Sequence, residues 1–256
     1  MVGSIIRKNF IMIISHSRKF VFVKTNKTAG SSFEGLLCHY LSDHDLITAI
    51  RLPEEKEYVG NALHQKNVHF LNGPKSTFEK SVKSEFSQHV SLDIAHTWFP
   101  ETKSYFSFGL IRNPFSRYIS SFRWRQGRKI RTLIKNCKGI REAEQKLQSE
   151  FLTFIRNDSG LLISRGRNLL QGTRPNGTTW SVDCVYKLEE LKYLEKDLKS
   201  KGIISDLDTS KMPRFKSQTF KIPTEINLWT EDSINAVRFA SSWEIEQMGY
   251  DDTPQM

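Results

Sequence analysis

The chain has 256 residues, 38% of them hydrophobic, which is enough for one large domain with a sizeable core. Its 38 lysines and arginines against 28 acidic residues give a formal charge of +10. This balance favours an anionic partner, such as a nucleotide, a polyanionic glycan, a nucleic acid or an anionic membrane, although a basic surface without a specific partner gives it too. Nothing in the sequence resembles a nucleic-acid-binding module.

The 3 cysteines are scattered and lack CxxC or Cys/His spacing, which argues against a structural zinc site and a disulfide framework. A reducing compartment is the simpler expectation. The apolar run Phe10–Ile14 is far shorter than the roughly 20 residues that span a bilayer, and no convincing cleavage site follows it. We therefore expect a soluble, cytoplasmic protein rather than a Golgi-type membrane-associated one.

Short apolar runs rich in β-branched and aromatic residues predict three buried strands, at 20–24, 106–111 and 182–188. A helical pattern follows each strand, at 32–41, 115–126 and 189–199. The alternation predicts an α/β fold with a central parallel β-sheet flanked by helices. Further helices are expected over 128–148 and 230–249, whereas 51–104 is expected to be irregular and 160–179 to be loop-rich.

The segment KTNKTAGSSFE, 24–34, lies between the first predicted strand and its helix. The first amides of a helix lack internal partners, and the helix dipole favours an anion there. Lys27 adds a mobile positive charge, and we expect Gly30 to let a ligand approach the backbone. Ser31-x-x-Glu34 is also a capping box, which by itself explains those two residues. The glycines of a GxxxxGK[ST] loop are missing, so a standard P-loop kinase or GTPase is disfavoured.

A second motif, RNPFSRYISSF, begins directly after the predicted strand at 106–111. A guanidinium at Arg112 suits bidentate contact with a phosphate. Arg117 and Ser120 are three residues apart and share a face of the next helix, away from its apolar stripe. A solvated basic face on a packed helix explains the same pattern equally well.

Taken together, KTAGSSF and RNPFSRYISSF resemble the sulfotransferase superfamily, most closely its carbohydrate branch with the heparan, dermatan and chondroitin enzymes and their bacterial relatives. The second motif matches RNPxxRxxSxF fully, whereas Asn26 replaces the proline that usually starts the first motif. The segments VDCVYKLEEL, PRFKS and IEQMGYD extend the resemblance over about 17–251, and the element His-x-x-Pro-Gln is absent. The resemblance implies a single P-loop-like domain over 1–256.

The resemblance implies 3′-phosphoadenosine 5′-phosphosulfate (PAPS) as the sulfuryl donor, a hydroxyl-bearing acceptor such as a glycan, and no metal. Lys27 would stabilise charge on the leaving phosphate, as both a catalytic and a cofactor-binding residue. Arg112 and Ser120 would hold the 3′-phosphate. The implied cofactor-binding residues are Lys27, Thr28, Ala29, Gly30, Ser31, Ser32, Arg112 and Ser120.

The acceptor hydroxyl needs a base, which the resemblance places between the two motifs. His96 is the expected catalytic base because an imidazole suits proton removal near neutral pH. His69, His89 and Glu34 stay open as alternatives. Basic residues around Trp124, over 123–135, are candidate acceptor contacts, although a solvated helix explains them as well.

Two other functions remain open on the sequence alone. A P-loop-like nucleotide kinase would also bind phosphate after the first strand, although no clear Mg²⁺-binding aspartate follows a strand. A non-catalytic polyanion-binding protein would explain the charge but leaves Lys27, Arg112 and Ser120 without a role.

Overall fold

The computed structural model describes residues 12–47, 69–70, 91–164, 166–174, 176–215 and 220–254. They fall into two compact units. The sheet unit consists of the described residues of Met1–Ile111 and Arg165–Phe215, and the helical unit of those of Arg112–Ser164 and Lys216–Met256. Whether the chain behaves as the single domain expected over 1–256 stays a prediction.

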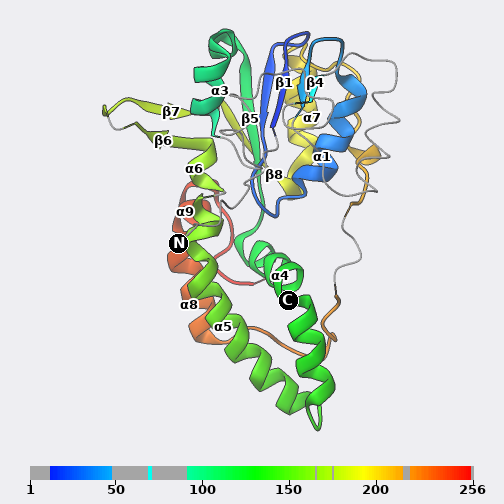
Figure 1. Ribbon diagram of the computed structural model, residues 1–256, viewed down its shortest axis with the longest axis vertical. Helices are drawn as coiled ribbons and strands as arrows, with labels where there is room; N and C mark the ends of the chain where they lie inside the picture. The colour runs from blue at the N-terminus through cyan, green and yellow to red at the C-terminus, as the bar shows by residue number, and fades with distance from the viewer. Residues whose placement is uncertain are drawn as a thin grey trace, which may run out of the picture. The chain divides into compact units, whose positions relative to one another are not determined.

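The sheet unit is built on a 6-stranded sheet in the order β4-β3-β1-β2-β5-β8 (Figure 1). Its strands are β1 (Met12–Ser15), β2 (Phe20–Val23), β3 (Leu46–Ile47), β4 (His69–Phe70), β5 (Phe106–Ile111) and β8 (Cys184–Lys187). Strands β2, β5 and β8 are parallel, with Val23 opposite Gly109 and Phe108 opposite Cys184. This arrangement confirms the α/β fold and the three predicted strands.

The sheet is mixed, however, and not wholly parallel as predicted. The apolar run that is too short for a membrane span supplies β1, which pairs antiparallel with β2 and with β3. Only the short turn 16–19 joins β1 to β2, and a connection of that length allows antiparallel pairing alone. Lys19 ends the turn with a positive φ of 56°.

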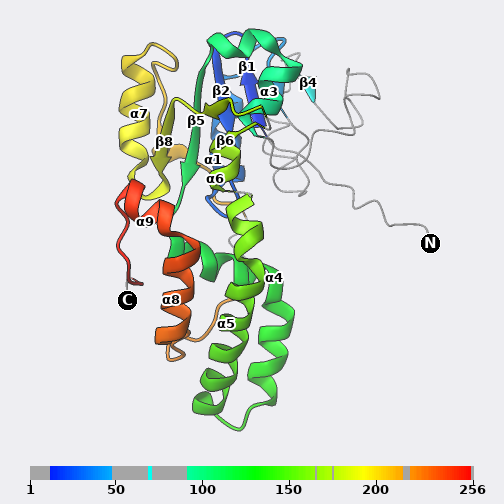
Figure 2. The same cartoon turned by 90° about the vertical axis from the view of Figure 1, so that its left-hand side faces the viewer.

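Helices cover both faces of this sheet. On one face α1 (Gly30–Leu37) and α7 (Leu191–Ser200) enclose a core with Phe22 and Phe108 of the strands. On the other face Leu170, at the end of α6 (Arg167–Leu170), packs so closely that a Cβ on Gly109 would lie 2.2 Å from it. Figure 2 shows α7 on one side of β5 and β8 and α6 on the other.

Two segments expected to be irregular contain regular structure. Within 91–104, α3 (Leu92–Trp98) precedes a 3₁₀ turn at Pro100–Ser104. Within 160–179, α6 leads into a two-stranded hairpin of β6 (Gln171–Thr173) and β7 (Thr179–Ser181). The two strands of this hairpin are short and mostly polar, so the segment resembles a loop in sequence.

The helical unit contains α4 (Pro114–Asn136), α5 (Ile140–Ser164), α8 (Glu231–Ala240) and α9 (Ser242–Met248). The apolar stripe of α4, which consists of Phe115, Ile119 and Phe122, packs into a shared core with Phe151 of α5 and Val237 of α8. Thr230 caps α8, since its hydroxyl accepts a hydrogen bond from the amide of Ser233 at 3.2 Å. Among the described residues, no helix is both long and apolar enough to cross a bilayer.

Candidate active site

The first motif forms the connection between β2 and α1, Lys24–Ala29, which we call the β2–α1 loop. Two of its non-glycine residues have left-handed backbone, Lys27 with φ 62° and Ala29 with φ 53°. Each such residue costs about 1–2 kcal/mol, and strain of this kind persists where the surrounding structure holds a functional conformation. Ala29 is the N-cap of α1, so Ser31 lies inside the helix and the alternative of a Ser31/Glu34 capping box is wrong.

The start of α1 presents backbone donors. The amide of Phe33 makes the first helical bond, to the carbonyl of Ala29 at 3.0 Å. The amides of Gly30, Ser31 and Ser32 precede that bond and lie at the positive end of the helix dipole. This geometry suits an anion, as the sequence predicts.

A buried ion pair, which no sequence motif marks, lies under this helix start. Nζ of Lys24 lies 2.8 Å from Oε2 of Glu34 and 2.8 Å from Oγ of Ser31. The side chains of Lys24 and Glu34 are only 6% and 1% exposed. Because Glu34 is buried in this pair, it cannot reach an acceptor hydroxyl as the alternative base.

The same lysine explains Gly30. A Cβ at position 30 would lie 2.5 Å from Cγ of Lys24, so the aliphatic part of Lys24 occupies the space that a side chain would need. The φ of Gly30 is not positive. Gly30 therefore serves the packing of Lys24, which is a different reason from the ligand approach that the sequence suggested.

Two threonines fasten the β2–α1 loop to the sheet. The hydroxyl of Thr25 donates to the carbonyl of Leu110 near the end of β5, and it lies 2.9 Å from the hydroxyl of Thr28. The Thr28 hydroxyl also donates to the carbonyl of Thr25 at 3.2 Å, and the side chain is fully buried. The expected role of Thr28 as a hydroxyl donor to a ligand is thus corrected, because that hydroxyl faces inward.

The segment from Pro213 to Phe215 packs against the first turns of α1. The amide of Phe215 donates to Oγ of Ser32 at 3.2 Å. A Cβ on Gly35 would lie 2.7 Å from the ring of Phe215 and 3.0 Å from Pro213. Gly35 thus makes room for this segment, which holds the Ser32 hydroxyl at the helix start.

In the helical unit, the second motif forms the beginning of α4. Asn113 is its N-cap and accepts a hydrogen bond from the amide of Ser116 at 3.1 Å, while Pro114 occupies the first turn. Arg112 directly precedes this cap, and Ser120 lies further along the same helix; both side chains are half-buried. The cap thus fixes where the chain leaves Arg112 and enters α4.

Arg117 of the same motif has a different environment from the expected solvated face. Its side chain is 1% exposed, and its Nη2 lies 2.6 Å from Oε1 of Glu244 on α9. The predicted common face with Ser120 therefore does not make Arg117 available to a ligand.

His96 lies on α3, within the sheet unit. Its Nδ1 is 2.9 Å from the hydroxyl of Thr102, which itself donates to the carbonyl of Phe99, so the imidazole donates from Nδ1. Burial, and then the charge of Lys103, hold the pKa of His96 below its ordinary value.

The position of His96 separates it from the β2–α1 loop. The chain from α3 enters β5 at Phe106, opposite Phe20 at the start of β2, whereas the loop follows Val23 at the end of β2. At about 3.3 Å per residue, the length of β2 from Phe20 to Val23 separates the two ends by about 10 Å. Figures 1 and 2 both show α3 at the far end of the sheet from the start of α1. The structure therefore does not place His96 beside the β2–α1 loop, although the sequence led us to expect it there.

Comparison with known proteins separates the sulfotransferase interpretation from the nucleotide-kinase interpretation. A sequence model described as the sulfotransferase family matches residues 11–202, which contain both motifs. The chain belongs to the sulfotransferase family. No curated protein and no solved structure matches this sulfotransferase significantly. Family membership implies PAPS-dependent sulfuryl transfer and leaves the nucleotide-kinase alternative without support.

The residues of the sulfotransferase fit such a donor. The start of α1 offers amides and the hydroxyls of Ser31 and Ser32, and Lys27 on the loop adds a cation. Glu34, a carboxylate just after the first turn of α1, is paired with Lys24 and adds no net charge. A phosphosulfate group needs this combination of donors and positive charge.

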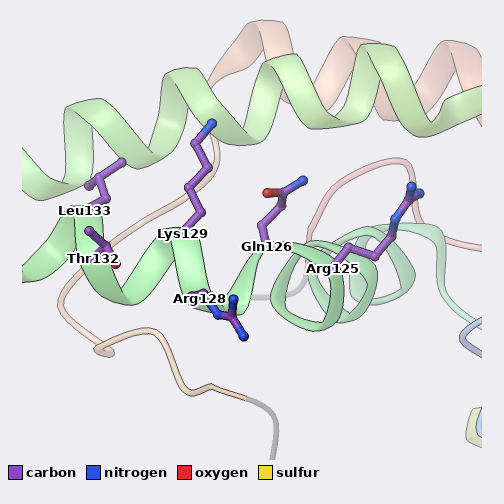
Figure 3. A pocket seen from close by; sticks show the side chains of 6 residues that line it. All are labelled: Arg125, Gln126, Arg128, Lys129, Thr132 and Leu133. Carbon is purple, nitrogen blue, oxygen red and sulfur yellow. The ribbon is translucent and has the colours of Figure 1, made fainter.

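The basic segment of α4 lines a hollow of about 490 Å³ in the helical unit of the sulfotransferase (Figure 3). Arg125 pairs with Asp158, and Lys129 points toward α5, where it pairs with Glu150 at 2.6 Å. Arg128 points to the other side of α4. The segment is therefore not a uniformly solvated basic face, because two of its cations are paired with carboxylates of α5.

Proposed function

We propose that this sulfotransferase transfers the sulfuryl group of PAPS to a hydroxyl of a carbohydrate acceptor, and that the β2–α1 loop binds the 5′-phosphosulfate. The observation that carries the proposal is the strained loop itself. It holds Lys27 in left-handed backbone directly before the first amides of α1, which lie at the positive end of the helix dipole. When bound, PAPS supplies the sulfuryl group and a phosphate leaving group.

In this proposal the loop binds the anion with fixed donors and one mobile cation. The amides of α1 and the hydroxyls of Ser31 and Ser32 orient the 5′ group. Lys27 neutralises the negative charge that increases on the leaving oxygen, which is where electrostatic stabilisation is most effective. Thr28 contributes by stabilising the loop from within, because its hydroxyl is already bonded to the carbonyl of Thr25.

Arg112 and Ser120 are proposed to bind the 3′-phosphate. A guanidinium contacts two phosphate oxygens at once, and a hydroxyl adds a third donor. The capped start of α4 supports this role, because Asn113 and Pro114 fix the backbone that carries Arg112. This contact would distinguish PAPS from adenine nucleotides without a 3′-phosphate.

The carbohydrate acceptor is supported by α4. Trp124 is 47% exposed, although large aromatic side chains are usually buried, and basic residues precede and follow it in the chain. An aromatic face beside cations suits a sugar ring with hydroxyl or anionic substituents. For the acceptor's proton, His69, on β4, is the remaining described alternative to His96, and His89 lies outside the described residues.

Calorimetric binding of 3′-phosphoadenosine 5′-phosphate, with ADP and ATP as comparison ligands, tests the donor site. We expect binding of the 3′-phosphorylated nucleotide alone, weakened roughly 10- to 100-fold in Lys27→Ala and in Arg112→Ala, as for hydrogen bonds to charged groups. Lys103→Ala and Arg141→Ala, at exposed positions of the same two units, are the matched controls. Equal binding of ATP, or binding of none of the three, would overturn the proposal.

Transfer of labelled sulfate from PAPS tests the acceptor class. The panel holds polysaccharides, a tyrosine peptide and small alcohols. Label in polysaccharide alone, with a raised KM for it in Trp124→Ala, supports the carbohydrate acceptor. Label in the peptide or in the alcohols would replace it. Intact nucleotide binding with no transfer to any of them would favour the non-catalytic polyanion-binding alternative.

A further inference from the structure

We propose that Lys24 is a positioning residue for the 5′-phosphosulfate: it holds the hydroxyl of Ser31 as a hydrogen-bond donor toward the bound anion. The inference rests on the proposed function, since it concerns the same β2–α1 loop. Lys24 does not touch the nucleotide itself. It acts through Ser31, from the buried side of the helix start.

The geometry brings three polar groups together beneath the first turn of α1. Nζ of Lys24 lies 2.8 Å from both Oγ of Ser31 and Oε2 of Glu34. Lys24 and Glu34 are almost completely buried, whereas Ser31 is partly exposed. Ser31 is therefore the member of the cluster that connects the buried pair to the surface of the helix start.

The chemistry of the lysine sets the role of the hydroxyl. An ammonium group has three donors and no acceptor, so the bond between Lys24 and Ser31 is donated by Lys24. The hydroxyl hydrogen of Ser31 must then be donated to an acceptor other than Lys24. Accepting a bond from a cation also polarises the hydroxyl and strengthens it as a donor. A phosphosulfate at the helix N-terminus offers the oxygens that such a donor requires.

Glu34 makes this arrangement possible inside the protein. A buried ammonium without a counter-charge is strongly destabilising, and the carboxylate of Glu34 compensates it. Gly30 provides the space, since any Cβ there would overlap the Lys24 side chain. Glu34 thus compensates the charge of Lys24, whereas Lys24 contacts Ser31. The stability of the pair and its effect on Ser31 can therefore be tested separately.

A mutant cycle that measures the affinity for 3′-phosphoadenosine 5′-phosphate tests the proposal. Its corners are the wild type, Ser31→Ala, the neutral pair Lys24→Met/Glu34→Met, and the triple variant. Replacing both members of a buried pair avoids a lone buried charge, so the neutral pair is expected to fold. We expect a loss of about 10-fold for Ser31→Ala, for the neutral pair and for the triple variant alike, because one hydrogen bond is lost in each.

Glu34→Gln distinguishes positioning from simple stabilisation. It leaves Lys24 bonded to Ser31 but removes the counter-charge, so it should lower stability in urea while affinity stays within about twofold of wild type. This variant also tests the proposal where the neutral pair fails to fold. An affinity that falls together with stability in Glu34→Gln would indicate a structural role and overturn the inference.

The cycle has its own decisive outcomes. Losses that multiply to about 100-fold in the triple variant would mean that Lys24 acts independently of Ser31, and wild-type affinity in the neutral pair would mean that it does not act at all. Either result overturns the inference while leaving the proposed function intact. A wild-type protein that does not bind the nucleotide overturns the proposed function itself, before any variant is compared.

Discussion

Arg117 and Glu244 form a buried ion pair, with Nη2 of the guanidinium 2.6 Å from Oε1 of the carboxylate. Arg117 belongs to the second motif on α4, and Glu244 lies on α9. Within the described residues, Nε and Nη1 of Arg117 have no hydrogen-bond partner. Glu244 therefore carries most of the compensation for a buried positive charge in the helical unit.

Removing this carboxylate is expected to destabilise the protein strongly. Glu244→Gln leaves the guanidinium of Arg117 buried without a counter-charge, which typically lowers the free energy of unfolding by about 3–5 kcal/mol. Urea unfolding measures the change. The matched control is Glu150→Gln, which breaks an exposed pair with Lys129 in the same unit and should change stability by about 1 kcal/mol or less. Equal effects of the two substitutions would contradict the prediction.

Gly30→Ala is expected to reduce both stability and nucleotide affinity. The new Cβ would lie 2.5 Å from Cγ of Lys24, near the backbone end of that side chain, so the whole side chain must move. The bonds from Lys24 to Glu34 and Ser31 would be lost with it. Overpacking of this kind costs about 1–3 kcal/mol, measurable in urea, and binding of 3′-phosphoadenosine 5′-phosphate reports the second effect.

Gly139→Ala is the control for that substitution. Gly139 directly precedes α5, and a Cβ there would meet nothing within 4 Å. We expect this variant to bind the nucleotide as the wild type does. If Gly30→Ala also matched the wild type, the close packing of Lys24 against the start of α1 would not hold in solution.

The elements that position the two motifs could be predicted from the sequence because their signals are local. Apolar runs mark β2 and β5, and the Asn113-Pro114 pair marks the start of α4. The role of β1 was missed because the apolar run Phe10–Ile14 has no strand-specific period and the pairing depends on a turn. Its antiparallel direction could have been inferred from the short connection to β2.

The buried ion pairs could not be predicted from the sequence in the same way. Lys24 and Glu34 meet because a strand ends beneath the first turn of the next helix, and no local spacing rule describes that contact. Arg117 is buried because Glu244, distant in sequence, reaches it. Such pairs depend on tertiary packing, which the helical period of α4 does not reveal.

The position of His96 carried a usable signal. His96 precedes β5, whereas Lys27 follows β2, and these two strands are parallel. A residue just before a strand lies near its amino end, and one just after a parallel neighbour lies near the opposite end of the sheet. The order of the elements therefore already argued against joining His96 to Lys27.

We accordingly expect His96→Gln to retain sulfuryl transfer. A positioned general base contributes about 100- to 10,000-fold to a rate, so loss of a true base would be unmistakable. His96 instead bonds Thr102 beside the start of β5. We expect turnover with PAPS to stay near the wild-type value, and a fall of about 100-fold or more would return His96 to the active site.

His96 should instead make the folded protein less stable at acidic pH. Burial, and then Lys103, hold its pKa in the folded protein below the ordinary value of 6.5. The unfolded chain therefore binds the proton more readily than the folded protein does. As the pH falls below about 6.5, protonation of the unfolded chain lowers the free energy of unfolding. Urea unfolding at about pH 8 and about pH 5.5 measures the loss, which should be smaller in His96→Gln than in the wild type. His39→Gln, at an exposed position, is the control, and an equal reduction in both variants would contradict the assignment to His96.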